Sequence, residues 1–110
     1  MHAVEVLSLE GQIVNGETEI LRGAVQLASD ISDIVLDLSN VTNVDAHGLG
    51  VLLQLREQML AQGIQFELIN VNRRLYRIFE ITRLNTVFEI NCGVSFIPAI
   101  AYQQRVPVAA

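Results

Sequence analysis

The sequence predicts an α/β domain in which four to five strands form a mixed, largely parallel sheet, with helices packed mainly on one face. Two observations support this fold class. Short apolar runs rich in β-branched residues alternate with segments whose apolar residues recur at helical spacing, which implies right-handed crossovers between parallel strands. The 110 residues also match the common size of one domain, and 51% apolar with only 5% aromatic residues indicates an aliphatic core.

The first third of the chain predicts two short strands and a helix. Residues 4–9 alternate loosely between apolar and polar side chains and end at a Glu-Gly pair, and a second short segment, Gln-Ile-Val at residues 12–14, follows directly. A turn between the two runs predicts an N-terminal hairpin. Apolar residues then recur at helical spacing, which predicts a first helix that ends near Asp30. The residues available to cap its start are Asn15, Gly16 and Thr18.

The middle of the chain predicts the central strand of the sheet and a second helix. Residues 34–38 form a nearly continuous apolar run rich in β-branched residues, the pattern of a strand buried on both faces. A polar connection follows over residues 39–44. The second helix begins near His47 and stops at Gly63, where a glycine suits the left-handed conformation after a C-cap.

The next segment predicts another strand, a third helix and an edge strand. Residues 64–69 form the strand, and an amphipathic helix begins near Asn70 or Asn72, either of which can cap it. Residues 87–90 form the last strand, at an edge of the sheet.

The C-terminal tail is part of a single domain, 1–110, whose core covers about residues 4–90. For residues 91–110 we expect one ragged helix over residues 94–102, because apolar residues cluster there but a proline interrupts them. Disorder is expected from about Arg105.

The charge balance argues against a nucleic-acid ligand. Seven Lys plus Arg against twelve Asp plus Glu give a formal net charge of −5, so no dense basic stripe is present to bind phosphates. The one basic cluster, formed by Arg73, Arg74 and Arg77, is interpreted as a solvated helix face.

The single cysteine, Cys92, excludes an internal disulfide and fits a reducing compartment, so a cytoplasmic protein is expected. No stretch reaches the roughly 18 apolar residues that a spanning helix needs, and we expect no insertion into a membrane. No metal site is expected, because His47 is accompanied only by His2 and this one cysteine. We expect no cofactor.

The most informative stretch runs from Asp37 to Leu53. A buried strand leads through a polar loop to Asp45, and a helix opens immediately afterwards, so Asp45 is placed to cap it and to meet a partner. Unpaired backbone N–H groups at a helix N-terminus make this end of the sheet a candidate recognition surface. The segment Gly48-Leu49-Gly50 lacks the further residues of a nucleotide-binding loop and indicates close helix packing instead. No nucleophile and base are paired here, and we expect no enzyme activity.

This strand, turn and apolar helix resemble the Asp-Ser-x-Gly-Leu-Gly-like turn of STAS domains, which occur in anti-sigma factor antagonists and in sulfate-transporter tails. The resemblance extends over roughly residues 4–90. Its further matching segments are residues 11–13, 34–38, 63–71 and 75–84.

The resemblance implies a bacterial, non-enzymatic signalling protein that regulates transcription by binding an anti-sigma factor, a serine kinase. In that family the kinase phosphorylates the serine after the aspartate, and this sequence carries Ala46 there, which offers no oxygen nucleophile. The acidic residue often found after the first Gly-x-Leu/Ile motif is replaced by Val14. Ser39, Thr42 and His47 remain as substitute phosphoacceptors. The partner surface that we expect contains Asn15, Asp45, Ala46, His47, Gly48 and Leu49.

Three hypotheses about function are therefore compatible with the sequence. The protein is a permanently unphosphorylatable antagonist, a scaffold subunit of a stress-signalling complex, or the STAS subunit of a lipid ABC transporter. In the scaffold reading, the apolar tail over residues 94–102 covers a neighbouring subunit, and the same tail is consistent with a homodimer.

Overall fold

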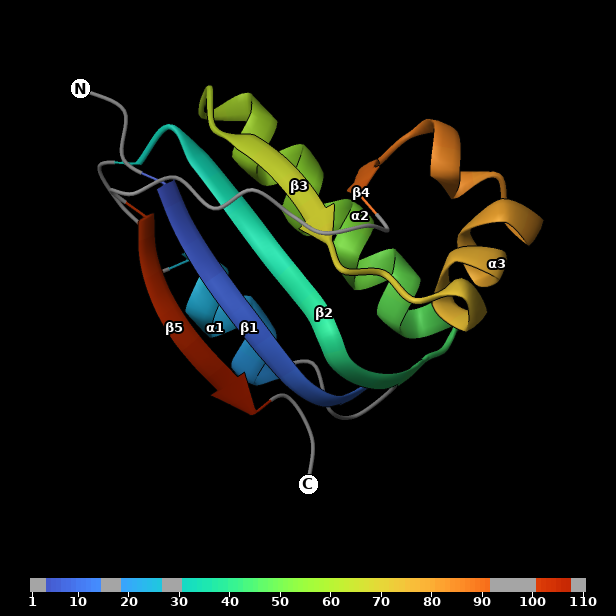
Figure 1. Cartoon of the computed structure of the whole chain (residues 1–110). Helices are drawn as coiled ribbons and strands as arrows, with labels where there is room; N and C mark the ends of the chain where they lie inside the picture. The colour runs from blue at the N-terminus through green and yellow to red at the C-terminus, as the bar shows by residue number, and fades with distance from the viewer. Residues whose placement is uncertain (1–3, 15–18, 27–30, 92–100, 108–110) are drawn as a thin grey trace.

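The computed structural model describes residues 4–14, 19–26, 31–91 and 101–107. The described strands form one sheet in the order β4-β3-β2-β1-β5, and every pairing in it is parallel (Figure 1). The predicted α/β class is confirmed, and these strands form a parallel rather than a mixed sheet. The elements are β1 (Val4–Ile13), α1 (Glu19–Gln26), β2 (Asp33–Val44), α2 (Ala46–Ala61), β3 (Gln65–Ile69), α3 (Arg73–Ile81), the 3-10 helix η1 (Leu84–Thr86), β4 (Glu89–Asn91) and β5 (Ala101–Pro107).

The helices pack on one face of the sheet, as predicted (Figure 1). Leu21 of α1, Leu52 of α2 and Phe79 of α3 belong to one buried cluster together with Leu36 of β2. Each such side chain contributes about 1.5–3 kcal/mol when it is fully buried. This cluster therefore supplies most of the hydrophobic stabilisation and fixes α2 against the sheet.

The opposite face of the sheet is less apolar and more acidic. Along β2, the buried Val35 lies between Asp33 and Asp37 on this face, because side chains alternate between the two faces of a strand. The apolar residues of this face form a second, smaller cluster of Val4, Val6, Val35 and Ile69. Carboxylates therefore lie among the apolar side chains of a partly covered surface.

The N-terminal hairpin prediction is wrong, because β1 is one strand from Val4 to Ile13. It pairs in parallel with β2 throughout, with one register shift between Ser8 and Glu10 and another directly after Gly11. Gly11 has a φ of 107°, which glycine adopts at little cost. The Glu-Gly pair therefore lies in a bulged part of a continuous strand and does not form a hairpin turn.

Strand β2 is longer than predicted and includes the segment 39–44 that was expected to be a connection. Asn40 and Asn43 are in register with the second half of β1, while Val41 and Val44 are buried in the core. The polar residues are accommodated because they occupy exposed positions, two before Val41 and two between Val41 and Val44. The strand therefore carries the chain directly to Asp45.

The predicted C-terminal end of the second helix and the predicted start of the third helix are confirmed. Gly63 follows α2 with a φ of 77° in the left-handed region. Asn72 caps α3, because the backbone N–H of Leu75 donates to its Oδ1 atom at 2.8 Å. The candidate caps of α1 (Asn15, Gly16 and Thr18) and its predicted end near Asp30 lie outside the described residues.

The predicted edge strand is present but shorter, as β4 covers Glu89–Asn91. Phe88, directly before it, is buried between two other rings. Its ring centroid lies 5.6 Å from that of Phe79 in an edge-to-face arrangement and 6.2 Å from that of Phe66. These contacts attach the β4 edge to both α3 and β3.

The tail prediction is wrong in the part that the structure describes. Residues Ala101–Pro107 form β5, parallel to β1 on the edge away from β2, where a helix end and disorder from Arg105 were expected. The pairing satisfies backbone groups along the second edge of β1, a gain that local periodicity does not reveal. The remainder of the predicted helix, residues 94–100, lies outside the described residues.

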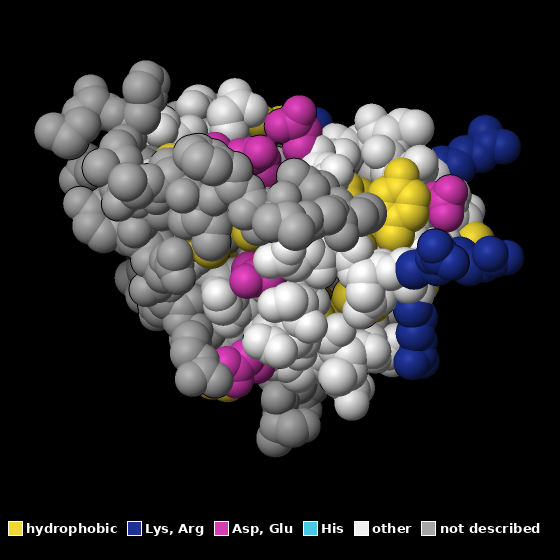
Figure 2. All heavy atoms as spheres, viewed as in Figure 1, with side chains coloured by type: hydrophobic (Ala, Val, Ile, Leu, Met, Phe, Trp, Pro, Cys, Tyr) yellow, Lys and Arg dark blue, Asp and Glu magenta, His cyan; other side chains and the backbone are white. Residues whose placement is uncertain are grey.

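The arginines of α3 are exposed, as expected for a solvated helix face. Figure 2 shows these cationic side chains gathered at the α3 side of the molecule, whereas carboxylates are spread over other parts of the same view. The exposed arginines are Arg73, Arg74, Arg77 and, just after the helix, Arg83. Among the described residues, none of the helices combines the length and hydropathy of a transmembrane span.

Candidate functional site

The candidate site lies where β2 ends and α2 begins. Asp45 has extended backbone angles and caps α2, because its Oδ1 atom accepts the backbone N–H of Gly48 at 2.7 Å. The Asp45 N–H also donates to the carbonyl oxygen of Ile13 at 3.3 Å. Since Ile13 and Val44 are in register at the ends of parallel strands, the start of α2 is fixed beside the end of β1.

Gly48 allows the close approach between α2 and β1. A Cβ atom at this position would overlap the carbonyl oxygen of Ile13, whereas a Cβ at Gly50 would have no atom within 4 Å. The close packing predicted for the Gly-Leu-Gly segment is therefore a property of Gly48. Gly50 instead leaves open space on the exposed side of the helix.

The residues predicted to form the partner surface divide into exposed and buried groups. Ala46, the first residue of α2, and His47 are exposed, while Gly48 and Leu49 are buried and position the helix. Asn15 lies outside the described residues. The structure thus leaves Ala46 and His47 as the accessible side chains that follow the cap.

The two hydroxyl residues considered as substitute phosphoacceptors lie on β2 rather than in a loop. Both are exposed. The hydroxyl of Thr42 donates to the backbone oxygen of Gly11 at 3.3 Å, and the backbone N–H of Ser39 donates to Asp37 Oδ1 at 2.9 Å. Neither belongs to the surface at the start of α2.

A hollow of about 300 Å³ lies beside the start of α2 and reaches α1. The Arg22 Nη2 atom of α1 donates to Gln54 Oε1 of α2 at 3.0 Å, across 32 positions of sequence. Arg22 could not be identified from the sequence, because its position beside Ala46 depends on how α1 and α2 pack. The hollow is lined by Arg22, Ala46, His47, Gly50, Val51 and Gln54.

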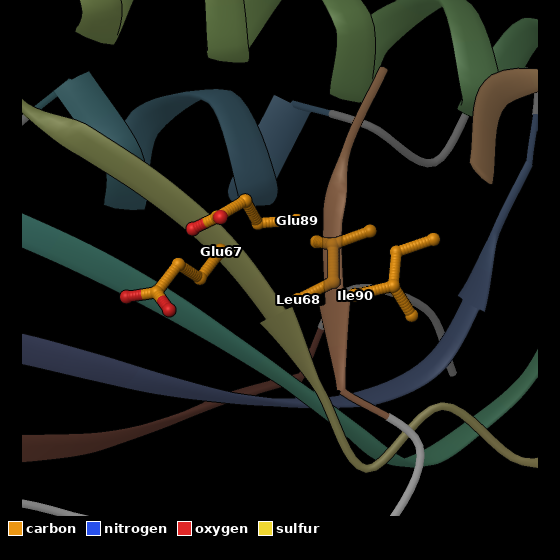
Figure 3. A pocket seen from close by; sticks show the side chains of 4 residues that line it. All are labelled: Glu67, Leu68, Glu89 and Ile90. Carbon is orange, nitrogen blue, oxygen red and sulfur yellow. The ribbon is translucent and has the colours of Figure 1, made fainter. Parts of the chain in front are cut away.

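A second polar region lies on the other face of the sheet, where carboxylates face one another. Glu67 of β3 is in register with Glu89 of β4, and both line a shallow pocket with Leu68 and Ile90 (Figure 3). Burial, a hydrogen bond with Glu67 and the negative charges of Glu67 and Glu89 raise the pKa of Asp33 to about 7. Asp33 Oδ1 is buried without a hydrogen-bond partner among the described residues.

A protein-family model matches most of the chain. The family model described as STAS domain matches residues 4–96, which include every strand and helix described above except β5. The chain belongs to the STAS domain family. The resemblance found in the sequence is therefore confirmed.

Relatives of this STAS protein include the anti-sigma-B factor antagonist of Bacillus subtilis (strain 168). It is 31% identical over 86 residues, which represent 77% of this chain and 79% of that protein. A Thermotoga neapolitana protein whose name also contains "anti-sigma factor antagonist" is 33% identical over 62 residues, 56% of this chain and 55% of its own.

The fold also matches a solved structure. The crystal structure of a sulfate transporter family protein from Wolinella succinogenes superposes with a TM-score of 0.74 at 20% identity, covering 83% of this chain and 78% of that one. At this identity the match establishes the STAS fold alone.

Proposed function

We propose that this STAS protein is an anti-sigma factor antagonist that binds an anti-sigma factor of the serine-kinase class through the exposed start of α2. We further propose that this complex is not released by phosphorylation, because position 46 is an alanine and cannot be phosphorylated. The observation that carries the proposal is the placement of Ala46, exposed and directly after the capping Asp45. The name of the Bacillus subtilis relative supports an anti-sigma factor as the partner.

The chemistry of position 46 explains the proposed regulation. A phosphoserine adds a charge of about −1.5 to −2 and three acceptor oxygens, which disrupts a contact surface built for a neutral side chain. The methyl group of Ala46 cannot accept a phosphoryl group. The complex then persists for as long as the protein is present, and its amount sets the response.

The proposed role needs no catalysis by the STAS protein, because any phosphoryl transfer belongs to its partner. The antagonist acts by occupying the anti-sigma factor, so that the sigma factor is freed by competition. Its activity is measured as binding and not as turnover, and we place it among cytoplasmic regulators of transcription.

The test combines binding with mass measurement. The purified protein is incubated with each serine-kinase anti-sigma factor of its source genome, with ATP and Mg²⁺, and complex formation and intact mass are recorded. We expect a stable complex and no gain of about 80 Da, the mass of one phosphoryl group. A mass gain would contradict the proposed insensitivity and direct attention to Ser39, Thr42 or His47.

The matched variant is Ala46→Ser, which restores the missing hydroxyl at an exposed position. We expect this variant to bind as the unaltered protein does without ATP, to gain about 80 Da with ATP, and then to dissociate. If the protein forms a complex with none of the anti-sigma factors, the proposed function is wrong and the scaffold or transporter hypothesis is favoured.

A further inference from the structure

The hollow beside the start of α2 combines positive charge with open space. Arg22 supplies a guanidinium group, and the backbone N–H groups of Ala46 and His47 lie in the first turn of α2, where the helix itself offers them no acceptor, whereas that of Gly48 already donates to Asp45 Oδ1. The imidazole of His47 adds a ring N–H donor. None of the described residues that line the hollow is a carboxylate, although the chain as a whole carries a net charge of −5.

We propose that this hollow is the subsite that receives an acidic side chain of the protein partner, with Arg22 as the residue that binds its carboxylate. The inference rests on the proposed function, because it names the chemistry that the partner presents to this surface. Charge complementarity indicates an acidic occupant, because the hollow contains the positively charged Arg22 and hydrogen-bond donors. The exposed Ala46 also lines the hollow, which therefore adjoins the proposed partner surface.

The geometry of Arg22 supports this role. A guanidinium carries five N–H donors, and the hydrogen bond to the neutral Oε1 atom of Gln54 uses the Nη2 atom of Arg22. No carboxylate pairs with Arg22 among the described residues, where the ion pair found is that between Arg56 and Glu57. Within the part of the chain that the structure describes, Arg22 is therefore not paired with a carboxylate, and its planar set of donors suits bidentate carboxylate binding.

Space for the incoming side chain comes from the small residues of α2. Gly50 has no atom within 4 Å of the position where its Cβ would lie, and Ala46 lies one turn earlier on the same side of the helix. A longer side chain at either position would fill the hollow.

The competing explanation is that the Arg22–Gln54 hydrogen bond only ties α1 to α2. The two explanations predict opposite results for Gln54→Glu. A carboxylate at position 54 would pair with Arg22 inside the chain, so the tie would become stronger and the thermal midpoint would stay equal or rise. In our proposal the same carboxylate occupies the donors and repels the partner's acid, so binding weakens.

The experiment measures the dissociation constant for the purified anti-sigma factor that binds the unaltered protein, together with thermal melts of each variant. We expect Arg22→Gln and Gln54→Glu each to weaken binding about tenfold or more without lowering the melting midpoint of Gln54→Glu. Arg73→Gln, which removes an exposed arginine on α3, is the matched control and should bind normally. The affinity of the unaltered protein should also fall as NaCl is raised.

The partner's residue is then found by charge exchange. Arg22→Glu should abolish binding, and one Asp→Arg or Glu→Arg change on the anti-sigma factor should restore it. If the unaltered protein binds but Arg22→Gln and Gln54→Glu both bind equally well, this subsite is wrong while the proposed function stands. If the unaltered protein binds no anti-sigma factor, the proposed function itself fails.

Discussion

The two ends of β2 carry aspartates in opposite surroundings. Asp45, just after the strand, accepts a 2.7 Å hydrogen bond from the backbone of Gly48 and begins a helix. Asp33, the first residue of the strand, faces the carboxylates of Glu67 and Glu89, and one of its oxygens is buried without a described hydrogen-bond partner. One carboxylate is stabilised by backbone donors, while the other is held among groups that oppose its ionisation.

The site end of the fold is held by a cap and by close backbone packing, whereas the opposite end brings three carboxylates together. At the site end, capping and close packing act on the same turn, and both position α2 against β1. At the acidic end, a proton on Asp33 relieves the repulsion, so stability depends on pH.

The largest effect is expected for Gly48→Ala. The added methyl group would overlap the backbone oxygen of Ile13, which cannot move without distorting the pairing of β1 and β2. We expect the free energy of unfolding to fall by about 3 kcal/mol or more, as measured by urea denaturation.

The matched control for this change is Gly50→Ala, on the open side of the same helix. With nothing within 4 Å of the new methyl group, we expect a gain of about 0.5–1 kcal/mol from helix propensity. Equal stability of the two variants would show that the contact between α2 and β1 is not the constraint that the structure indicates.

An intermediate, pH-dependent effect is expected for Asp33→Asn. The pKa of Asp33 rises from 3.8 to about 7 on folding, so the folded state binds more protons than the unfolded state between these pH values. Stability from this group is therefore fully present below about pH 4 and is lost as the pH rises towards 7. We expect Asp33→Asn to stabilise the protein by about 1 kcal/mol at pH 8, a value reduced for solvent screening, and to have little effect at pH 4.

Asp37→Asn is the matched control on the same strand and face. Asp37 accepts hydrogen bonds from the backbone of Ser39 at 2.9 Å and from Asn70 Nδ2 at 3.2 Å, and the Ser8 hydroxyl lies 3.5 Å from its other oxygen. Replacement by an amide weakens these bonds, so urea midpoints at pH 8 should move in the opposite direction from those of Asp33→Asn. A shift in the same direction would contradict the assignment of strain to Asp33.

Features that depend on interactions between residues close in sequence could be predicted, and features that depend on contacts between distant residues could not. The start and end of α2 were predictable, because Asp45 and Gly63 act on backbone groups within a few residues. Strand β5 was not predictable, since its pairing with β1 joins residues almost a hundred positions apart. Arg22 could not be identified for the same reason, because its place in the hollow depends on the packing of α1 against α2.

The bulge in β1 illustrates a different limit. A glycine that follows a glutamate between apolar runs is a local turn signal, and the hairpin prediction relied on it. The parallel register with β2 continues past Gly11 and overrides that signal, because pairing satisfies more backbone groups than a turn does. The expectation that Ala46 stands at the phosphoserine position, by contrast, came from the family resemblance alone; the structure shows that Ala46 is exposed and directly follows the capping Asp45.

The smallest expected difference, that between the unaltered protein and Asp45→Asn, separates the cap of Asp45 from its charge. Asp45→Ala removes the acceptor for the Gly48 N–H and should lower the free energy of unfolding by about 1 kcal/mol. Asp45→Asn keeps an acceptor oxygen at the same place, so its urea midpoint should stay within about 0.3 kcal/mol of the unaltered protein. If Asn is as costly as Ala, the negative charge at the helix N-terminus, rather than the hydrogen bond, is what orders the start of α2. The end of β2 would then resemble its beginning in being governed by charge.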